Sequence, residues 1–512
     1  MIIPRSPLWT LMAPCALAAT LSACATTPRQ DAHDRAATIG MLDRISWGVN
    51  AAAVRQVDAV GWPAYLDAQL RQQAAPMPAP LQAQIAAMTI SQQSLDVLVS
   101  ALQQRRRDAD ATAGDDAKKA AQQAYQDELN RLAREAATRS LLRDLYSDTQ
   151  LLEHMSWFWM NHFNVHQGKS DLRAMVGDYE ETAIRPHALG KFSDLLAATA
   201  HHPAMIRYLD NEQNAVKHLN ENYARELMEL HTLGVDGGYS QADVQELARI
   251  LTGVGVNTGS AVPAVRKELQ AQYLRRGLFE FNPNRHDYGD KQFLGHAIHG
   301  RGLAELDEAI GLLARSPATA TFVSRKLAQY FVTDDPAPAL VQRMAAQFSA
   351  TDGDIAATLR TLFASPEFAQ SLEHKFKDPV HYVVGAVRLA YDDKLILNSA
   401  PMLNWLGRMG EPLYGRQTPD GYPLVASAWA SPGQMTTRFE IAKAIGSGSA
   451  GLFKTDGPHP QERAAFPQLA NALYFQSLQQ RLSPATRQAL EQSTSPQEWN
   501  TFLLASPELM HR

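Results

Sequence analysis

Residues 151–163 read LLEHMSWFWMNHF, and the chain continues with NVH to residue 166. Tryptophan, phenylalanine and methionine would lie on every side of a helix formed by this segment. A helix that is apolar all round is buried in a protein core. Asn161 and His162 at its end must then find hydrogen-bond partners, because an unpaired buried polar group costs roughly 1–3 kcal/mol. The segment predicts a buried helix within a large helical body.

Helical periodicity continues on both sides of this segment. No regular alternation of strands and helices appears, which argues against a doubly wound fold. Residues 279–281 and 291–294 flank a turn-rich segment and are candidates for a small hairpin. We therefore expect a mainly α protein, a large multi-helix domain with at most a small β-hairpin and long loops near its C-terminal third. The expected helices include residues 38–50, 115–145, 151–163, 185–199, 221–232, 305–314, 317–332, 336–350, 354–364, 379–391 and 436–445.

The composition excludes several classes of protein. The 512 residues include 48 Lys and Arg against 53 Asp and Glu, and 45% are hydrophobic. This is the composition of a globular protein, and its formal net charge of −5 gives no electrostatic footprint for nucleic acid. The only cysteines are Cys15 and Cys24, so neither a disulfide scaffold nor a cysteine-rich zinc site is available.

The N-terminus has the features of an export signal. Arg5 precedes a mostly apolar stretch at residues 8–21, which is short for a membrane span. Leu21-Ser22-Ala23-Cys24 resembles a bacterial lipobox. An ordinary signal peptide cut near Ala23, or a short membrane anchor, is the alternative. The lipobox predicts a signal peptide at residues 1–23, a lipidated Cys24 that holds the protein to a membrane, and a polar tether at 24–37.

The remaining chain divides into a helical body at residues 38–445 and a C-terminal helical segment at 446–512 packed on it. Residues 104–137 form a charged helical insertion, which we expect to be solvated. Residues 446–451 match the GxGxxG pattern, but a helical pattern precedes them where a dinucleotide site requires a strand. The sequence contains no HExxH, Walker A or GxSxG motif. These absences argue against a zincin, a P-loop protein and an α/β-hydrolase.

Two histidines at the end of the buried helix are four residues apart. His162 and His166 would share a face if the helix persists, which is a spacing that can hold a divalent metal. Spacing fixes no third ligand, and His162 could instead form a hydrogen bond in the core. His162 is therefore the candidate metal ligand, and whether a metal cofactor binds stays open.

The densest ionisable run is residues 218–231, HLNENYARELMELH. Asn222, Glu226 and Glu229 fall on one side of a helix, and Arg225 lies four residues before Glu229. The run leaves little room for a clean apolar stripe, so charged groups must share the buried side. Buried groups of this kind form either a paired structural network or a site with perturbed pKa values.

Two loops add further polar and aromatic residues. Residues 285–291, RHDYGDK, bring His286 and Asp287 to a turn-rich loop, and such loops often have functional roles. Adjacent side chains need not face each other, so no catalytic dyad follows. Residues 411–429 contain Tyr414, Tyr422 and Trp429, which line a pocket or, more simply, fill the core under a long loop.

Residues 222–239, NYARELMELHTLGVDGGY, resemble the signature of the bacterial Domain of Unknown Function 1800 family. The resemblance implies an exported protein of helical build. Members often lie beside genes for an exported family that resembles alkaline phosphatases and sulfatases, which implies an envelope partner but no reaction and no catalytic residue. Ala25 after the cysteine resembles the outer-membrane sorting pattern of Gram-negative lipoproteins. The other matching segments are residues 42–48, 157–165, 286–295, 324–327, 351–355, 365–368 and 418–429.

Two functions fit these features. The first is an envelope enzyme, hydrolytic by its compartment and with its metal dependence open. The second is a non-catalytic binding or assembly lipoprotein that works with the phosphatase- or sulfatase-like partner. An open pocket bordered by unpaired Glu229, His231 and His162 would favour the enzyme, and mutual pairing would favour the second function. The catalytic candidates are Asn222, Arg225, Glu226, Glu229, His231, His286 and Asp287.

Overall fold

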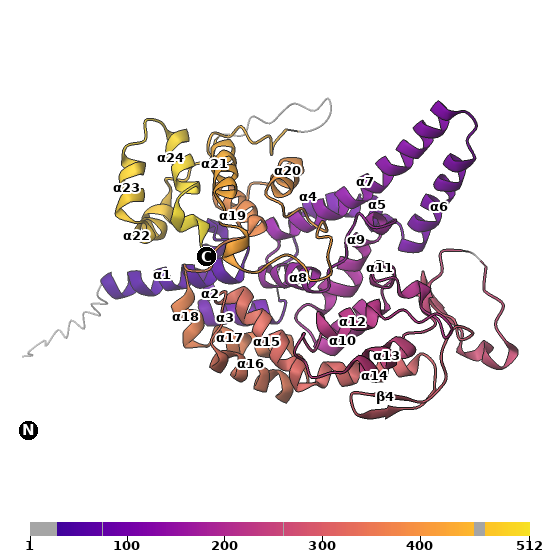
Figure 1. Ribbon diagram of the computed structural model, residues 1–512. Coiled ribbons are helices and arrows are strands. Elements are labelled where there is room, and N and C mark those ends of the chain that lie inside the picture. Colours follow the sequence, from indigo (N-terminus) through magenta and orange to yellow (C-terminus); the bar gives the residue numbers. More distant parts are fainter. Residues whose placement is uncertain (1–27, 74, 260, 455–465) are drawn as a thin grey trace, which may run out of the picture.

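The computed structural model describes residues 28–73, 75–259, 261–454 and 466–512 (Figure 1). The expected signal peptide and Cys24 lie outside these residues. No helix in the described ranges combines the length and the apolar character that a membrane span requires. The chain is mainly α, as expected, and its hydrophobic residues form one large continuous core with a small second cluster between α6 and α7.

The first half of the chain contains the helices that surround the centre of the molecule. They are α1 (Pro28–Ile45), α2 (Ala51–Val60), α3 (Trp62–Leu70), α4 (Ala79–Ala86), α6 (Leu95–Ala111), α7 (Asp115–Tyr146), α8 (Gln150–His162), α10 (Phe192–His201), α11 (Pro203–Tyr208), α12 (Asn222–Glu229) and α13 (Gln241–Ile250).

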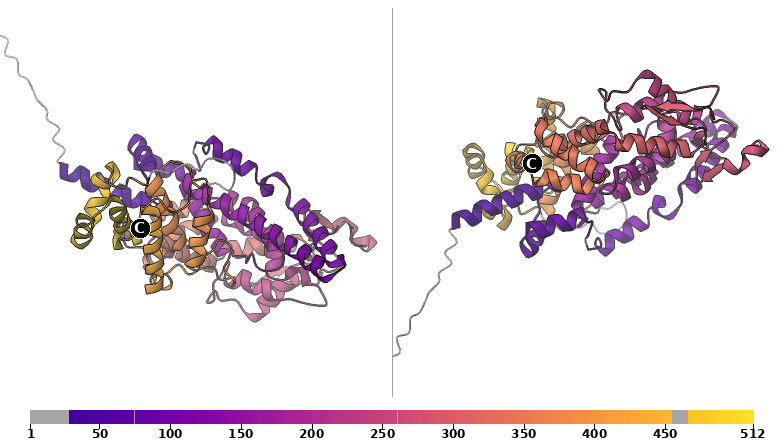
Figure 2. Two further views of the ribbon diagram at one scale, coloured as in Figure 1. Left: turned by 90° about the horizontal axis from the view of Figure 1, so that it is seen from above. Right: turned by 90° about the horizontal axis from the view of Figure 1, so that it is seen from below.

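The second half adds helices that cover the body and form the C-terminal segment. They are α14 (Ala304–Arg315), α15 (Pro317–Phe331), α16 (Pro338–Ala350), α17 (Ile355–Phe363), α18 (Pro366–Ser371), α19 (Pro379–Tyr391), α20 (Ala400–Arg408), α21 (Pro432–Gly446), α23 (Pro484–Glu491) and α24 (Pro496–Leu504). The last helices pack on α21 and lie at the same end of the molecule as α1 (Figure 2).

Helix α1 begins earlier than the sequence predicts. Its first residue is Pro28, inside the stretch assigned to a polar tether at residues 24–37. Proline fits the first position of a helix because its missing N–H would have no partner there. Alanine, arginine and glutamine, which favour helices, then continue α1 to Ile45.

Helix α7 confirms the expected long charged helix. Its last turns, from Ala136 to Leu145, are largely buried, whereas its first half is mostly exposed. Helix α6 packs against that first half, and the two helices project from the body as an arm (Figure 1). The exposed charges of the arm are those of a solvated helix pair.

The predicted pairing of residues 279–281 with 291–294 is wrong. Strand β3 (Phe279–Phe281) pairs with β1 (Val254–Val256) and β2 (Leu274–Arg276), all antiparallel. Strand β4 (Lys291–Phe293) pairs instead with β5 (His296–Ile298). Leu294 and Gly295 both have positive φ, which is the geometry of a tight two-residue hairpin turn. This turn gives β4 a partner much nearer in the chain than β3.

Helix α8 lies in the core, and every one of its residues is buried. It contacts α3 and α7, and Figure 1 shows it near the middle of the molecule. The indole of Trp159 donates to the carbonyl oxygen of Ala188 at 2.9 Å. The prediction of a buried central helix is confirmed.

Backbone groups from remote segments satisfy the polar end of α8. The Asn161 amide donates to the carbonyl oxygen of Tyr422 at 2.9 Å, and its own oxygen accepts from the Tyr422 N–H at 2.5 Å. Asn164 donates to the carbonyl oxygens of Arg416 and Thr418 at 3.0 and 2.9 Å. Gly421 has a φ of +77°, and a Cβ there would lie 2.2 Å from the Asn161 carbonyl oxygen. The loop at 416–422 is therefore fixed on the end of α8.

We predict that Asn161→Ala lowers the free energy of unfolding by about 2–3 kcal/mol, because it leaves the buried N–H and C=O of Tyr422 without partners. Urea denaturation followed by circular dichroism measures the change. Asn404→Ala on the exposed face of α20 is the control and should change stability by less than about 0.5 kcal/mol. Equal losses in the two variants would contradict this role for Asn161.

Candidate functional site

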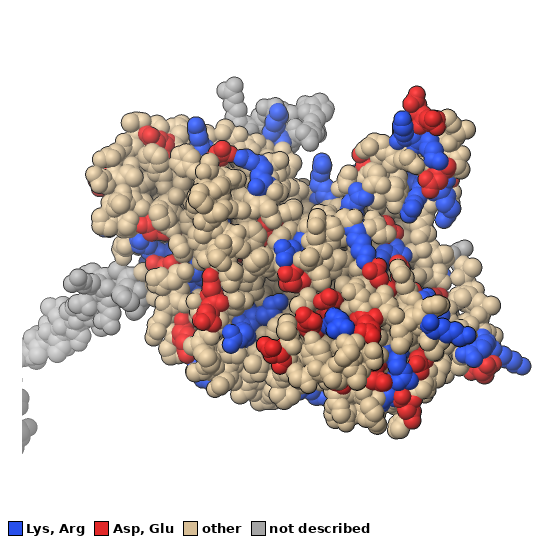
Figure 3. Space-filling view, in the orientation of Figure 1, with Lys and Arg blue, Asp and Glu red and all other residues tan. Residues whose placement is uncertain are grey.

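Five ionisable side chains on or beside α8, α12 and α15 form two neighbouring groups, and we call them together the α12 cluster; His162, His231 and Lys326 form one group, and Glu226 and Glu229 form the other. Two glutamates come from α12, one histidine follows that helix, one histidine ends α8, and one lysine lies on α15. On the same face of the molecule, acidic and basic side chains surround a hollow near its centre (Figure 3). The α12 cluster consists of His162, Glu226, Glu229, His231 and Lys326.

The two histidines are buried and incompletely hydrogen-bonded. His162 donates through Nε2 to the carbonyl oxygen of His231 at 3.0 Å, and their ring centroids lie 6.1 Å apart. Its Nδ1 and both ring nitrogens of His231 have no partner among the described residues. Burial, with the positive charge of Lys326, lowers the pKa of His231 to about 3 and holds the pKa of His162 well below its usual value. Both imidazoles are therefore neutral at pH 7.

Lys326 is a cation without an ionic partner. No ion pair or hydrogen bond to its ammonium occurs in the part of the chain that the structure describes, and Nζ lies 5.5 Å from the centre of the Phe322 ring. Burial lowers the pKa of Lys326 to about 8, and the negative charge of Asp420 opposes this shift. A lysine with such a pKa changes its charge close to physiological pH.

Three lysines that are less exposed than Lys326 are all paired. Lys291 lies 2.5 Å from Glu305, Lys375 lies 2.5 Å from Asp334, and Lys377 lies 3.6 Å from Asp43. Pairing is the usual way in which a fold compensates a buried charge. Lys326 departs from this rule, as do the histidines beside it.

The two glutamates of the cluster lie one helical turn apart and are half-buried. Neither carboxylate has an ion pair or a side-chain hydrogen bond among the described residues. Burial, and then the negative charge of Glu229, raise the pKa of Glu226, and Asp420 adds to this effect. Asp420 forms an ion pair with Arg416 at 2.8 Å, and its negative charge also acts on Glu226 and on Lys326.

Two of the predicted catalytic residues, Asn222 and Arg225, form hydrogen bonds and an ion pair that stabilise α12. Asn222 begins α12 and donates to the carbonyl oxygen of Leu209 at 3.2 Å. Arg225 pairs with Glu221 at 3.1 Å and donates to Gln241 at 3.0 Å, and its positive charge opposes the rise in the pKa of Glu226. Their contacts fix the start and one side of α12.

His286 and Asp287 belong to a separate, paired network. His286 is hydrogen-bonded to Glu305 at 2.9 Å and to the carbonyl oxygen of Thr252 at 2.8 Å. Asp287 forms an ion pair with Arg249 at 2.9 Å. Neither has a hydrogen bond or ion pair with the α12 cluster in the described structure. The two residues act here as links between the β-strands and α13 and α14.

The aromatic residues of the 411–429 loop fill the core rather than line an open pocket. The Tyr414 hydroxyl donates to Glu180 at 2.8 Å, and the Trp429 indole donates to the carbonyl oxygen of Pro423 at 2.9 Å. Both side chains are buried. Tyr414 and Tyr422 border a small cavity of about 30 Å³, which favours the second interpretation from the sequence.

A second polar network, which the sequence did not reveal, lies deeper in the core. His154 on α8 contacts His381 through their Nε2 atoms at 2.5 Å, and Asp378 holds the other nitrogen of His381 at 2.7 Å. Arg512 donates to His154 at 2.9 Å. All four side chains are enclosed and joined to one another, so this network ties α8 and α19 to the end of the chain.

Sequence reasoning missed Lys326 and Asp420. Each lies in a short segment that matches the family resemblance, 324–327 and 418–429. No group of three or more His, Cys, Asp or Glu side chains in a metal-binding arrangement occurs among the described residues. The unpartnered nitrogens of His162 and His231 are the donors at the cluster that could hold a metal.

Comparison with known proteins identifies the family. A family model described as "Protein of unknown function (DUF1800)" matches residues 40–511. The chain belongs to the DUF1800 family. No curated protein and no solved structure matches it. The whole α12 cluster of this DUF1800 protein lies within the matched residues.

We predict that Lys326→Met leaves the free energy of unfolding at pH 7 unchanged or raises it by about 1 kcal/mol, because it removes an unpaired cation. Lys291→Met should lower it by about 3–5 kcal/mol, since it strands the buried Glu305 carboxylate. Urea titration of both variants measures the difference. A loss in Lys326→Met as large as that in Lys291→Met would show that Lys326 is a structural charge.

The contribution of Lys326 to the free energy of unfolding depends on pH in a defined direction. The pKa of Lys326 in the folded chain, about 8, lies below its ordinary value of 10.5, so the folded chain binds fewer protons between these values. The contribution of Lys326 to the free energy of unfolding therefore rises from pH 8 towards pH 10.5. The stability of Lys326→Met relative to wild type should fall over the same interval.

Proposed function

We propose that this DUF1800 protein is an exported, lipid-anchored enzyme that performs acid–base chemistry, with a hydrolytic reaction on a polymer of the cell envelope. The observation that carries the proposal is the unpaired state of the α12 cluster. Perturbed and uncompensated ionisable groups are typical of catalytic sites. A structural network would pair them, as the network around His286 and Glu305 does.

Each member of the cluster has a role that its surroundings support. Glu226, whose pKa is raised, keeps its proton to higher pH than an ordinary glutamate and would act as the general acid. Glu229 is the neighbouring carboxylate that can accept a proton. The ammonium of Lys326 would stabilise negative charge that develops on the substrate. The neutral imidazoles of His162 and His231 would orient the substrate by hydrogen bonds.

A divalent metal would use the same histidine nitrogens. His162 Nδ1 and the ring of His231 are free to coordinate, and neutral imidazole is the form that binds metal. The positive charge of Lys326 opposes a second cation beside them. Metal binding would therefore be stronger above pH 8, where Lys326 loses its proton.

The compartment is supported by the sequence alone. Leu21-Ser22-Ala23-Cys24 resembles a lipobox, and Ala25 fits sorting to the outer membrane. The family resemblance implies a phosphatase- or sulfatase-like exported partner. These features support a substrate among the polymers that an outer-membrane lipoprotein meets.

We predict that Glu226→Gln and Lys326→Met each lower the rate at which soluble products form from isolated envelope fractions of the host. The expected decrease is about 10²- to 10⁴-fold, which is the usual contribution of acid–base groups. Mass spectrometry of the soluble products measures the rate. Arg343→Gln, at an exposed ion pair on α16, is the control and should keep the wild-type rate. The wild-type rate should fall above pH 8 as Lys326 loses its proton.

One outcome would overturn the proposal that the protein is an enzyme. If no product distinguishes the wild type from Glu226→Gln although both are folded, the cluster is not catalytic. The non-catalytic binding lipoprotein would then be the better function. Elemental analysis of the same protein, with His162→Ala alongside, shows whether a metal is held at the cluster.

A further inference from the structure

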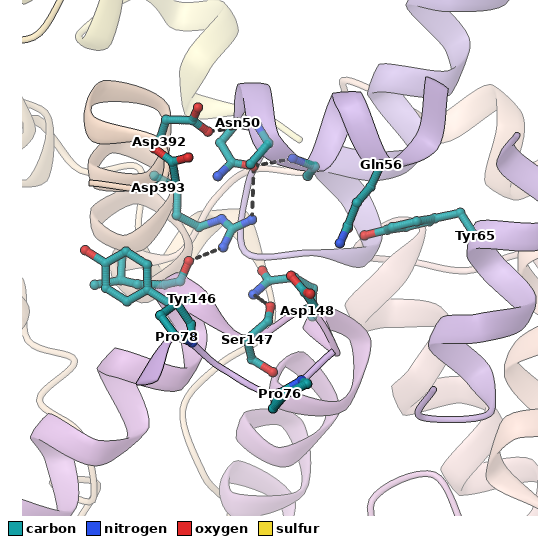
Figure 4. Close-up of a pocket in the computed structure, with 15 residues that line it drawn as sticks. Asn50, Gln56, Tyr65, Pro76, Pro78, Tyr146, Ser147, Asp148, Asp392 and Asp393 are labelled. Atoms are coloured by element: carbon teal, nitrogen blue, oxygen red, sulfur yellow. Dashed lines mark hydrogen bonds between the residues drawn. The ribbon is translucent and has the colours of Figure 1, made fainter. Parts of the chain in front are cut away.

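A cavity of about 250 Å³ lies on another part of the molecule, between α2, α3 and the ends of α7 and α19 (Figure 4). It shares no residue with the α12 cluster. Its apolar wall is formed by alanines and prolines, among them Ala53, Pro76 and Pro78. Its polar wall contains Tyr65, Asp148 and Arg388. We call it the Tyr65 cavity.

Arg388 forms a fixed part of this wall. Its Nε donates to the carbonyl oxygen of Gly48 at 3.0 Å, and Nη1 donates to the carbonyl oxygens of Asp144 and Leu145. Nη2 lies 3.4 Å from the side-chain oxygen of Asn50. The guanidinium is thus held by neutral oxygens and makes no ion pair among the described residues. Its hydrogen-bonding capacity is largely used.

Tyr65 has an unused polar group that faces the cavity. Only 5% of the residue is exposed, and its hydroxyl has no hydrogen-bond partner in the described part of the chain. In Figure 4 its oxygen points towards the side chain of Gln56, into the cavity. Burial raises the pKa of Tyr65 to about 12, so the hydroxyl remains protonated. The hydroxyl can therefore hydrogen-bond to a polar group that binds in the cavity.

Asp148 supplies a negative charge that has no ion pair among the described residues. Burial raises the pKa of its carboxylate, while a hydrogen bond from Gln56 and the positive charge of Arg388 oppose this shift. At the rim, Asp392 and Asp393 lie 3.4 and 3.8 Å from Arg55, so those carboxylates already face a cation. Figure 4 places Asp148 and the two rim aspartates on different sides of the cavity. Asp148 is the one carboxylate of the wall that a ligand would neutralise.

We infer that the Tyr65 cavity binds a small organic amine. The ammonium group would lie against the Asp148 carboxylate and the Tyr65 oxygen, and a short alkyl chain would pack on the prolines and alanines. The volume limits the ligand to a few carbon atoms, since drug-sized ligands need roughly 300–1,000 Å³. The combination of an apolar wall with an unpaired carboxylate favours such an amine over a sugar, whose hydroxyl groups need polar partners on several sides.

Calorimetric titration of the protein with 1,5-diaminopentane at pH 7.5 tests the inference. We expect saturable binding with a Kd between about 10 μM and 1 mM. Asp148→Asn and Tyr65→Phe should each weaken it at least tenfold, while Asp393→Asn at the exposed rim should weaken it less than threefold. Thermal unfolding of each variant confirms that it is folded.

Two probes of similar length identify the chemistry. 1,5-Pentanediol lacks the charge and glutarate has the opposite charge, and neither should bind measurably at 10 mM. Binding of the diol as strong as that of the diamine, or no binding of the diamine, would overturn the inference. Lys326→Met should bind the diamine like the wild type, so failure here is separate from failure of the proposed enzyme.

Discussion

The end of α8 can be buried only because remote backbone comes to meet its polar side chains. Asn161, His162 and Asn164 each bond to a segment at least 69 residues away in the chain. These bonds replace the water that the side chains lose on folding, and without them the burial of the helix end would be unfavourable. They also hold the 416–422 loop and the residues after α12 against one another.

The hydrogen bonds at the end of α8 also position the residues of the candidate site. The bond from His162 to the His231 carbonyl oxygen places two imidazoles beside α15. The loop held by Asn161 contains Asp420, which pairs with Arg416 and whose negative charge acts on Lys326. The side chains that form hydrogen bonds with the backbone, such as Asn161, are thus different from those that stay unpaired, such as Lys326. A fold that pairs Lys291, Lys375 and Lys377 yet leaves Lys326 free accepts a local loss of stability, which is common where function requires a reactive group.

Much of this architecture follows from local sequence. The apolar residues on every side of residues 151–163 predict a buried helix, and the spacing of Glu226 and Glu229 predicts that they share a face. Ser240 and Asp243 form a capping box at the start of α13, with both of its hydrogen bonds present. Such features depend on neighbours within a few residues, so sequence alone can reveal them.

The remaining features depend on partners that the sequence does not place. The sequence shows no partner for His286 or Asp287, but in the structure Glu305 pairs with His286 and Arg249 pairs with Asp287. Lys326 has the spacing of an ordinary surface lysine, and only the packing of α15 against α8 and the loop shows that it lacks a partner. Strand β4 was assigned to the wrong hairpin because the tight turn at Leu294 and Gly295 has no proline, aspartate or asparagine to mark it.

The ionisation of Lys326 tests the central claim most directly. Nuclear magnetic resonance of protein labelled at the lysine ε-carbon follows each amine through pH 6–11, and Lys326→Met identifies its signal. The account predicts one lysine that titrates with a pKa of about 8, about two units below the ordinary value of 10.5, and that is missing in the variant. A Lys326 signal that titrates near pH 10.5 or above would mean that the ammonium is solvated or paired, and would contradict the account of an unpaired functional site.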